Sequence, residues 1–283
     1  MSKEQVISNK SMDEERALYN LKNAELNNCY FSGPQDGESA LKEARDIEVN
    51  NCAFSLRYPM WHVQTFSMKN SSMDQNVRAA LWYSNDGTIS QSYIGGVKAV
   101  RECNRIKIDN CEIHSAEFGW KCDSITLTNG SISSEYLFLD SENITMKNIR
   151  MKGKYSFQYN ENLFIEDCSL DTKDAFWHAH NVTVKNCLVK GEYLGWFSDG
   201  LTLENCKIIG TQPFCYCSNL KLINCTMDDA DLAFEYSDVD ADIYSHVVSI
   251  KNVKSGRIVV DSVGEIINDD PVMECTGTVI VRK

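Results

Sequence analysis

Residues 181–189 have the sequence Asn-Val-Thr-Val-Lys-Asn-Cys-Leu-Val, and this short pattern recurs along most of the chain. Two alternating apolar positions, Val182 and Val184, lead to Asn186 and Cys187, and another apolar residue follows three positions after the asparagine. Aligned on that asparagine, or on the residue that replaces it, the pattern occurs at positions 28, 51, 70, 91, 110, 129, 148, 167, 186, 205 and 224. From 91 to 224 every interval is 19 residues. A fixed period of this length indicates a repeat architecture in which each unit packs on its neighbours.

Each repeat contains one clear strand signal. The residues four and two positions before the asparagine are apolar, as at Ile106 and Ile108, and the residues between and after them are polar. This period-two alternation predicts a short strand with one buried face. Such a short unit leaves no room for a helix, so each repeat should form one coil of about three strands, which pair in parallel with their copies about 4.8 Å away.

The predicted fold class is therefore all-β: a single-stranded, right-handed parallel β-helix (solenoid) of about a dozen coils with a 19-residue period. The handedness follows from the general chirality of parallel connections. The asparagine fits the corner of each coil, because it tolerates the left-handed backbone conformation that a tight bend needs. Stacked asparagines can also bond to one another as a ladder.

The repeat predicts one domain with three parts. Residues 1–14 form a polar N-terminal segment, residues 15–236 carry the β-helix repeats, and residues 237–283 form an irregular C-terminal β segment that shields the last edge of the stack.

Charge and hydropathy limit the choice of partner and compartment. The formal net charge of −12 argues against a nucleic-acid groove and against an anionic membrane surface. The polar N-terminus does not resemble a signal peptide, and no apolar run approaches the roughly 20 residues of a membrane span. We therefore expect a cytoplasmic protein with no nucleic-acid partner and no membrane partner.

The twelve cysteines follow the repeat and do not form a metal-binding motif. Seven directly follow the register position, and Cys103, Cys122 and Cys217 share a second register. This pattern is typical of a small buried apolar residue that stays reduced. The chain also lacks zinc spacing, a glycine-rich phosphate loop and a dinucleotide fingerprint. We predict no metal and no cofactor.

Three neighbouring register positions contain the candidate functional residues. Ten residues before the asparagine no polar side chain occurs, so this position should face the core. The residues nine before are Tyr19, Lys42, Trp61, Trp82, Arg101, Trp120, Leu139, Gln158, Trp177, Trp196 and Cys215. The residues eight before are Asn20, Glu43, His62, Tyr83, Glu102, Lys121, Asp140, Tyr159, His178, Phe197 and Tyr216.

The nine-before position contains all five tryptophans together with Lys42 and Arg101. Because isolated charges are costly to bury, we predict that the nine- and eight-before positions together face outward at a bend. We call these two columns the aromatic strip. The alternative is strict alternation, which would turn the tryptophans into the core and leave the ten-before phenylalanines as an exposed apolar stripe.

An exposed strip of rings and hydrogen-bonding groups suits an extended ligand such as a saccharide chain, whose apolar faces stack on aromatic rings. The candidate ligand-binding residues are Lys42, Glu43, Trp61, His62, Trp82, Tyr83, Arg101, Trp120, Tyr159, Trp177 and Trp196.

Four residues of the strip are candidate catalytic groups. Glu102, Lys121 and Asp140 occupy successive coils, which places the two carboxylates roughly 10 Å apart with a cation between them, close to the wider spacing of inverting glycosidases. His178 follows in the same column, with Asp174 nearby in sequence. If these groups hydrolyse a bond, replacing Asp140 or His178 abolishes the activity. Charged groups on a β-helix face are otherwise ordinary solvated surface.

Several segments resemble one bacterial family, the domain-of-unknown-function family numbered 3737. The segments that carry the resemblance are residues 15–19, 37–43, 58–62, 80–84, 174–178, 192–196 and 232–237. The resemblance implies a pectin-lyase-like right-handed β-helix over nearly the whole chain. Members are often labelled as hydrolases, and the resemblance implies no catalytic residues.

Two functions of different classes follow. The first is a saccharide-recognising β-helix that hydrolyses its ligand as a glycoside hydrolase or cleaves it as a lyase. The second is a non-catalytic interaction or scaffold protein in which the aromatic strip joins copies of a homo-oligomer, since large exposed aromatic surfaces often mark such contacts.

Overall fold

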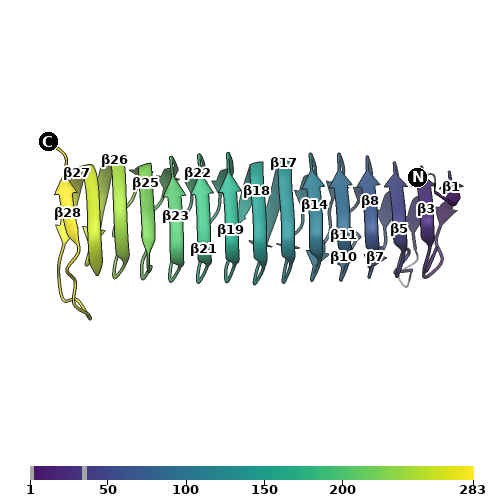
Figure 1. The fold of residues 1–283 in the computed structure, drawn as a ribbon, viewed down its shortest axis with the longest axis horizontal. Helices are drawn as coiled ribbons and strands as arrows, with labels where there is room; N and C mark the ends of the chain where they lie inside the picture. Colours follow the sequence, from purple (N-terminus) through teal and green to yellow (C-terminus); the bar gives the residue numbers. More distant parts are fainter. Residues whose placement is uncertain (1–2, 34–36) are drawn as a thin grey trace. The chain divides into compact units, whose positions relative to one another are not determined.

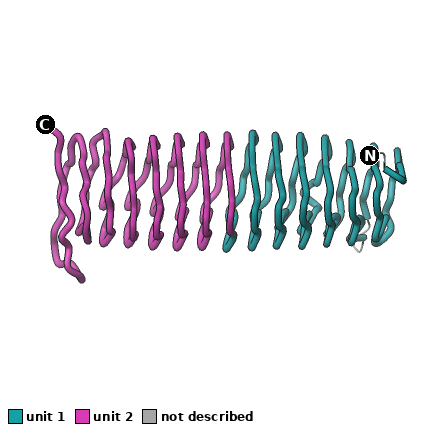
Figure 2. The backbone as a smooth tube through the Cα atoms, viewed as in Figure 1, with its two compact units in different colours: residues 1–141 teal, residues 142–283 magenta. Residues whose placement is uncertain are grey.

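The computed structural model describes residues 3–33 and 37–283 as strands joined by turns, with no helix among them. The chain divides into two compact units, residues 1–141 (unit 1) and residues 142–283 (unit 2), which Figure 2 shows in teal and magenta. No helix of the described part is long and apolar enough to cross a membrane.

Unit 1 is built from parallel strands in three series (Figure 1). The first series carries the alternating apolar positions and comprises β1 (Gln5–Ser8), β3 (Lys22–Asn27), β5 (Arg45–Asn50), β8 (Gln64–Lys69), β11 (Asn85–Ser90), β14 (Asn104–Asp109) and β17 (Asp123–Leu137). The second comprises β2 (Ser11–Met12), β4 (Tyr30–Ser32), β6 (Ala53–Ser55), β9 (Ser72–Met73), β12 (Tyr93–Ile94) and β15 (Glu112–His114). The third comprises the short strands β7 (Met60–Trp61), β10 (Leu81–Trp82) and β13 (Val100–Arg101), and the separate strand β16 (Glu117–Phe118) pairs with β17.

Unit 2 repeats the first two series and replaces most of the third by turns. Its regular coils contain β19 (Glu161–Glu166), β20 (Ser169–Asp171), β21 (His180–Lys185), β22 (Leu188–Lys190), β23 (Asp199–Glu204) and β24 (Lys207–Ile209). Longer strands flank them: β18 (Glu142–Lys154), β25 (Leu220–Asp228), β26 (Asp238–Lys251), β27 (Ser255–Ile267) and the shorter β28 (Thr278–Val281).

The strands pair in parallel, and each residue pairs with its counterpart one repeat further on. Ile108 of β14 pairs with Ile89 of β11 and with Leu127 of β17, and Val184 of β21 pairs with Leu203 of β23. This register confirms the predicted parallel β-helix, because equal spacing in the sequence places equivalent residues side by side.

Residues in the left-handed region form the corners of the coils. The register asparagines Asn186, Asn205 and Asn224 have φ between 52° and 53°. Their side chains form a ladder: Asn205 Nδ2 donates to Asn186 Oδ1 (3.2 Å), and Asn224 Nδ2 donates to Asn205 Oδ1 (2.7 Å). The predicted structural role of the asparagine is confirmed, because it combines a tolerated bend with a repeating hydrogen bond.

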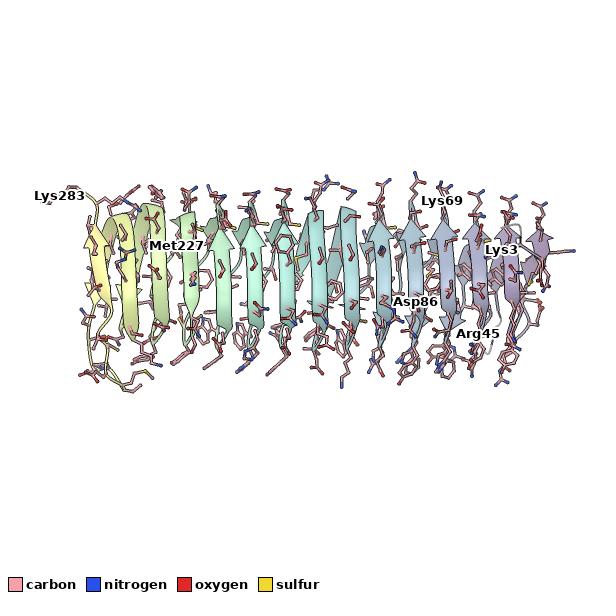
Figure 3. The ribbon with its side chains drawn as sticks, viewed as in Figure 1. Lys3, Arg45, Lys69, Asp86, Met227 and Lys283 are labelled. Carbon is pink, nitrogen blue, oxygen red and sulfur yellow. The ribbon has the colours of Figure 1, made fainter. Side chains whose placement is uncertain are left out.

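The core consists of the alternating positions and of stacked phenylalanines. Ile106 and Ile108 are 0% and 2% exposed, and Phe31 stacks on Phe54 with ring centroids 4.8 Å apart. Polar side chains project where the strands end: Figure 3 shows Arg45 at the start of β5 and Lys69 at the end of β8.

The cysteines are free thiols, and all except Cys275 are buried. Burial raises the pKa of the Cys52 thiol and of the Cys217 thiol to about 11. Protonated thiols are poor nucleophiles and poor metal ligands, so this environment fits the predicted role as small apolar residues.

The parallel pairing extends further toward both ends than the repeat indicates. Strands β1 and β2 lie within the segment predicted to precede the coils, yet they already pair in register with β3 and β4. In the predicted C-terminal segment, β26 to β28 continue the same parallel pairing. The alternation in β1 and β2 is too short to mark these strands in the sequence, whereas the strands of the C-terminal segment agree with the irregular β structure predicted there.

We predict that Asn205→Ala destabilises the protein by about 1 to 3 kcal/mol, because it removes two ladder hydrogen bonds and because alanine tolerates the left-handed region less well than asparagine does. Asn205→Gly keeps the backbone conformation and loses only the ladder, so it should cost less. Urea unfolding of both variants measures the difference. Equal losses would show that the backbone conformation does not matter at this corner.

Candidate functional site

The corner that carries the aromatic strip has a backbone conformation that ends the alternation of a strand. Val100 is fully buried, whereas the next two residues, Arg101 and Glu102, are both half-buried. Glu102 has a φ of 50°. The same left-handed conformation occurs at every eight-before residue: Asn20, Glu43, His62, Tyr83, Glu102, Lys121, Asp140, Tyr159, His178, Phe197 and Tyr216. Two consecutive side chains therefore face outward.

None of the five tryptophans lies in the core; all five are half-buried. The ten-before residues Leu81 and Phe176 are 0% and 1% exposed, so this column is the one that faces inward. The predicted orientation of the tryptophans is confirmed, and strict alternation is wrong at this corner because the left-handed residue interrupts it. Cys215, at 1% exposed, is the exception in the nine-before column.

In unit 1 the nine-before column is a continuous stack of cations and indoles. Lys42 Nζ lies 4.0 Å from the centroid of Trp61, which stacks on Trp82 at 5.4 Å. The Arg101 guanidinium lies 6.0 Å from Trp82 and 5.7 Å from Trp120. Cation–π contacts of this kind contribute about 0.5 to 1 kcal/mol each where they are exposed. The ring faces that a sugar would stack on are therefore occupied within the column.

The eight-before column of unit 1 begins with rings and ends with charges. The His62 ring stacks on the Tyr83 ring at 5.1 Å, and Glu43 occupies the same position one coil earlier. Glu102 accepts a hydrogen bond from Arg101 Nε at 3.2 Å. Partial burial opposes ionisation of Glu102, but hydrogen bonds from Tyr83 and Arg101 outweigh it, so the pKa of Glu102 is lowered. The hydrogen bond between Tyr83 and Glu102 also raises the pKa of the Tyr83 hydroxyl.

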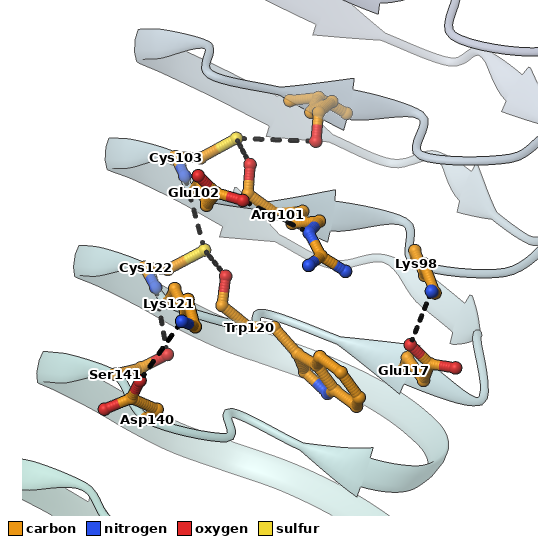
Figure 4. Close-up of polar contacts among 11 residues, drawn as sticks. Lys98, Arg101, Glu102, Cys103, Glu117, Trp120, Lys121, Cys122, Asp140 and Ser141 are labelled. Carbon is orange, nitrogen blue, oxygen red and sulfur yellow. Dashed lines mark hydrogen bonds and ion pairs between the residues drawn. The ribbon is translucent and has the colours of Figure 1, made fainter.

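Lys121 and Asp140 follow Glu102 in this column (Figure 4). Lys121 Nζ lies 3.7 Å from Asp140 Oδ2, and both side chains are largely exposed. The structure thus brings Glu102, Lys121 and Asp140 onto successive coils, as the spacing predicts. A glycosidase needs one carboxyl group that stays protonated, and Glu102 is held ionised instead. Glu102, Lys121 and Asp140 can therefore form hydrogen bonds with a ligand, but the ionised Glu102 cannot donate a proton.

Unit 2 contains a second stack of rings in the eight-before column. His178 lies between Tyr159 and Phe197, with centroid distances of 5.0 Å on both sides, and Phe197 stacks on Tyr216 at 4.8 Å. Both faces of the His178 ring are therefore covered, and only its edge faces outward. His178 and Asp140 belong to different units, so the structure does not bring these two candidate catalytic residues together in one described site.

The indole N–H groups divide the tryptophans into two classes. Trp120, Trp177 and Trp196 donate to the backbone carbonyls of Tyr136, Tyr193 and Gln212 at 2.8, 2.6 and 2.8 Å. These hydrogen bonds orient the three rings and leave their N–H groups unavailable to a ligand. Among the described residues, the buried N–H groups of Trp61 and Trp82 have no hydrogen-bond partner.

Asp174 is the buried carboxyl group nearest in sequence to these rings. Asp174 is only 7% exposed, and this burial raises the pKa of its carboxyl group. The positive charge of the nearby Lys173 partly opposes the rise in pKa. Its backbone carbonyl accepts a hydrogen bond from Gln158 Nε2 at 3.1 Å. Desolvated carboxyl groups with raised pKa values are common at functional sites, although structural positions can also produce them.

Unit 2 also has a groove that the sequence analysis missed. The groove has a volume of about 560 Å³, and its lining residues include Asp171, Lys190, Ile209 and Asp229. Asp171, Lys190 and Ile209 are the last residues of β20, β22 and β24, and Asp229 directly follows β25, so all four lie outside the aromatic strip. The glycines Gly191 and Gly210 at the same place in successive coils were the available signal.

Within residues 3–33 and 37–283, no group of three or more His, Cys, Asp or Glu side chains is placed to hold a metal ion.

A family comparison matches residues 5–281 to the model described as "Protein of unknown function (DUF3737)". The chain belongs to this family. The match spans nearly the whole chain and both units, and it agrees with the resemblance found in the sequence. A comparison with curated proteins gives no match.

Solved structures with a similar coiled architecture include tailspike protein 3 of bacteriophage CBA120, at 9% identity and a TM-score of 0.38 over 97% of this chain and 56% of that chain. The A-module of the Azotobacter vinelandii mannuronan C-5 epimerase has 11% identity and a TM-score of 0.36 over 96% and 88%. The catalytic domain of a GH87 α-1,3-glucanase in complex with nigerose has 10% identity and a TM-score of 0.34 over 97% and 63%. Likeness at this level carries no information about a ligand.

We predict that Asp174→Asn stabilises the protein at neutral pH. Because the folded-state pKa of Asp174 is raised, ionisation costs folding free energy above both pKa values, and the cost disappears below the unfolded value of about 3.9. The gain over the wild type should therefore shrink as the pH falls toward 3.5, which thermal melts at several pH values measure. Asp171→Asn, at an exposed position, is the matched control. A gain that is independent of pH would contradict the burial argument.

Proposed function

We propose that the aromatic strip of unit 1 binds a saccharide chain or a similar extended polyhydroxylated ligand. The observation that carries the proposal is the eight-before column, which presents one hydrogen-bonding side chain from each of five successive coils: His62, Tyr83, Glu102, Lys121 and Asp140. Coils are spaced about 4.8 Å apart, close to the length of one sugar residue in an extended chain. Donors and acceptors therefore recur at the interval at which hydroxyl groups recur.

The stacked geometry specifies how such a ligand is held. The faces of Trp61 and Trp82 cover each other, so a sugar meets ring edges and not ring faces. Affinity then comes mainly from hydrogen bonds to charged groups, which contribute about 1.5 to 3 kcal/mol each. Glu102 suits this role, because its lowered pKa keeps it an acceptor at neutral pH.

Binding without cleavage is the form of the proposal that the geometry favours. Hydrolysis by Glu102, Lys121, Asp140 and His178 requires a protonated carboxyl group beside the scissile bond. Glu102 accepts a hydrogen bond from Arg101, which favours its ionised carboxylate, and Asp140 Oδ2 lies 3.7 Å from Lys121 Nζ. Product analysis after long incubation with the ligand would detect hydrolysis by these four residues.

We predict that Glu102→Gln weakens binding of the best ligand from a panel of soluble oligosaccharides by about tenfold or more, because it removes an ionised acceptor. Tryptophan fluorescence of the strip reports the titration, and product analysis after long incubation tests for cleavage. Glu112→Gln, which changes an exposed carboxylate of β15 outside the strip, should bind like the wild type. The proposal fails if no oligosaccharide changes the fluorescence or if both variants lose affinity equally.

A second candidate function is a subunit interface on the same strip. The observation in its favour is that the tryptophans and Arg101 stay half-exposed and Tyr83 stays exposed although they stack within the columns, and these residue types are enriched at interfaces.

For the interface function, we expect the wild type to sediment as an oligomer and Tyr83→Glu to sediment as a monomer, because a charge on the strip opposes burial. Tyr30→Glu, at an exposed tyrosine outside the strip, is the control and should leave the oligomer intact. A monomeric wild type at micromolar concentration would exclude this function.

A further inference from the structure

The groove of unit 2 contains charges that do not neutralise one another. In this unit, lysines and carboxylates of neighbouring coils usually form ion pairs: Lys147–Glu166 (2.7 Å), Lys173–Glu192 (2.9 Å), Lys185–Glu204 (3.1 Å) and Lys207–Asp228 (2.8 Å). Asp171 and Lys190 are direct neighbours in the pairing of β20 with β22, and both line the groove. In the described part of the chain these two form no ion pair with each other or with another residue.

The unpaired charges of the groove have a definite order. Asp171, Lys190 and Ile209 occupy the same register position in three successive coils, because Lys190 pairs with Asp171 on one side and with Ile209 on the other. On the next coil Asp228 occupies this register position and pairs with Lys207, and the residue after it, Asp229, lines the groove. Along the groove the sequence of groups is therefore carboxylate, ammonium, apolar side chain, carboxylate.

The remaining charges of the groove are already satisfied. Lys173 pairs with Glu192 at 2.9 Å, and its Nζ also lies 5.3 Å from the centroid of the Tyr193 ring. With this pair set aside, one lysine and two aspartates remain among the lining residues, which leaves a net charge of −1. A ligand with one negative and two positive groups complements them.

We propose that this groove binds a free basic α-amino acid, such as lysine or arginine. The α-ammonium group pairs with Asp171 and the α-carboxylate pairs with Lys190, whose side chains start about 4.8 Å apart on neighbouring coils. The methylene stem lies along Ile209, and the side-chain cation reaches Asp229. The volume of about 560 Å³ falls in the range of small-molecule sites.

This site is independent of the saccharide proposal, because none of its residues belongs to the aromatic strip. Its chemistry also explains why Asp171 and Lys190 stay apart. If Asp171 and Lys190 formed an ion pair, their side chains would fill the groove. Because they are unpaired, each can pair with the opposite charge of the ligand.

The test is calorimetric titration of the full chain with L-lysine and with three analogues that each lack one group. Nα-acetyl-lysine lacks the α-ammonium charge, lysinamide lacks the carboxylate, and norleucine lacks the side-chain cation. We expect each analogue to bind the wild type about tenfold or more weakly than lysine, because each loses one charged hydrogen bond.

The variants Asp171→Asn, Lys190→Gln and Asp229→Asn should each lower the affinity for lysine to that of the matching analogue. Each variant should leave the affinity for its own matching analogue unchanged, since that contact is already absent. Glu161→Gln, at an exposed carboxylate of β19 outside the groove, is the control. Circular dichroism confirms that each variant is folded.

The proposal is overturned if lysine produces no heat at millimolar concentration. It is also overturned if norleucine binds as tightly as lysine, or if the three groove variants bind lysine like Glu161→Gln. Matched losses in each variant–analogue pair support it, because a general loss of structure would not select one functional group of the ligand.

Discussion

The structure depends on one constraint: parallel strands in constant register place every side chain against its counterpart one coil away. A residue type is acceptable at a given position only if it tolerates that neighbour. Amides tolerate it by bonding, as Asn205 does with Asn186 and Asn224. Flat rings tolerate it by stacking, as Phe31 does on Phe54, and opposite charges tolerate it by pairing, as Lys185 does with Glu204. The core, the corners and most of the surface follow this rule.

The same constraint shapes what the surface can recognise. In the aromatic strip it turns neighbouring rings face to face, so Trp61 and Trp82 stack on each other and their faces are covered on that side. Glu102 interrupts the rings of the eight-before column and accepts a hydrogen bond from Arg101. The groove of unit 2 is the opposite case. There Asp171 and Lys190 are in register and remain unpaired, and the hollow beside them stays open.

The sequence predicts the fold well because the fold depends on spacing alone. Ile106 and Ile108 show the buried face, and the interval between register asparagines shows which residues pair. The orientation of Trp82 and Tyr83 required a further inference from charge, because many residue types occupy the left-handed position at Tyr83 and none marks it. Gly191 and Gly210 were a signal for the groove, but its unpaired charges could not be predicted, since whether Asp171 and Lys190 meet depends on side-chain reach and not on register. The short strands β1 and β2 were missed because two to four residues carry too little alternation.

Because all coils share one register, a whole coil can be gained or lost without shifting the pairing of the remaining strands. Between β19 and β25 the chain could lose residues 186–204, one whole repeat, and Asn205 would then take the place of Asn186 beside Asp167. Strand would still meet strand, because each coil contacts only its neighbours, and Phe214 would face Phe176 where it now faces Gly195. Loss of a single residue from β21 would instead turn its buried valines outward. Duplication and deletion of complete coils is therefore a route by which such a chain can change length without changing the register of its strands.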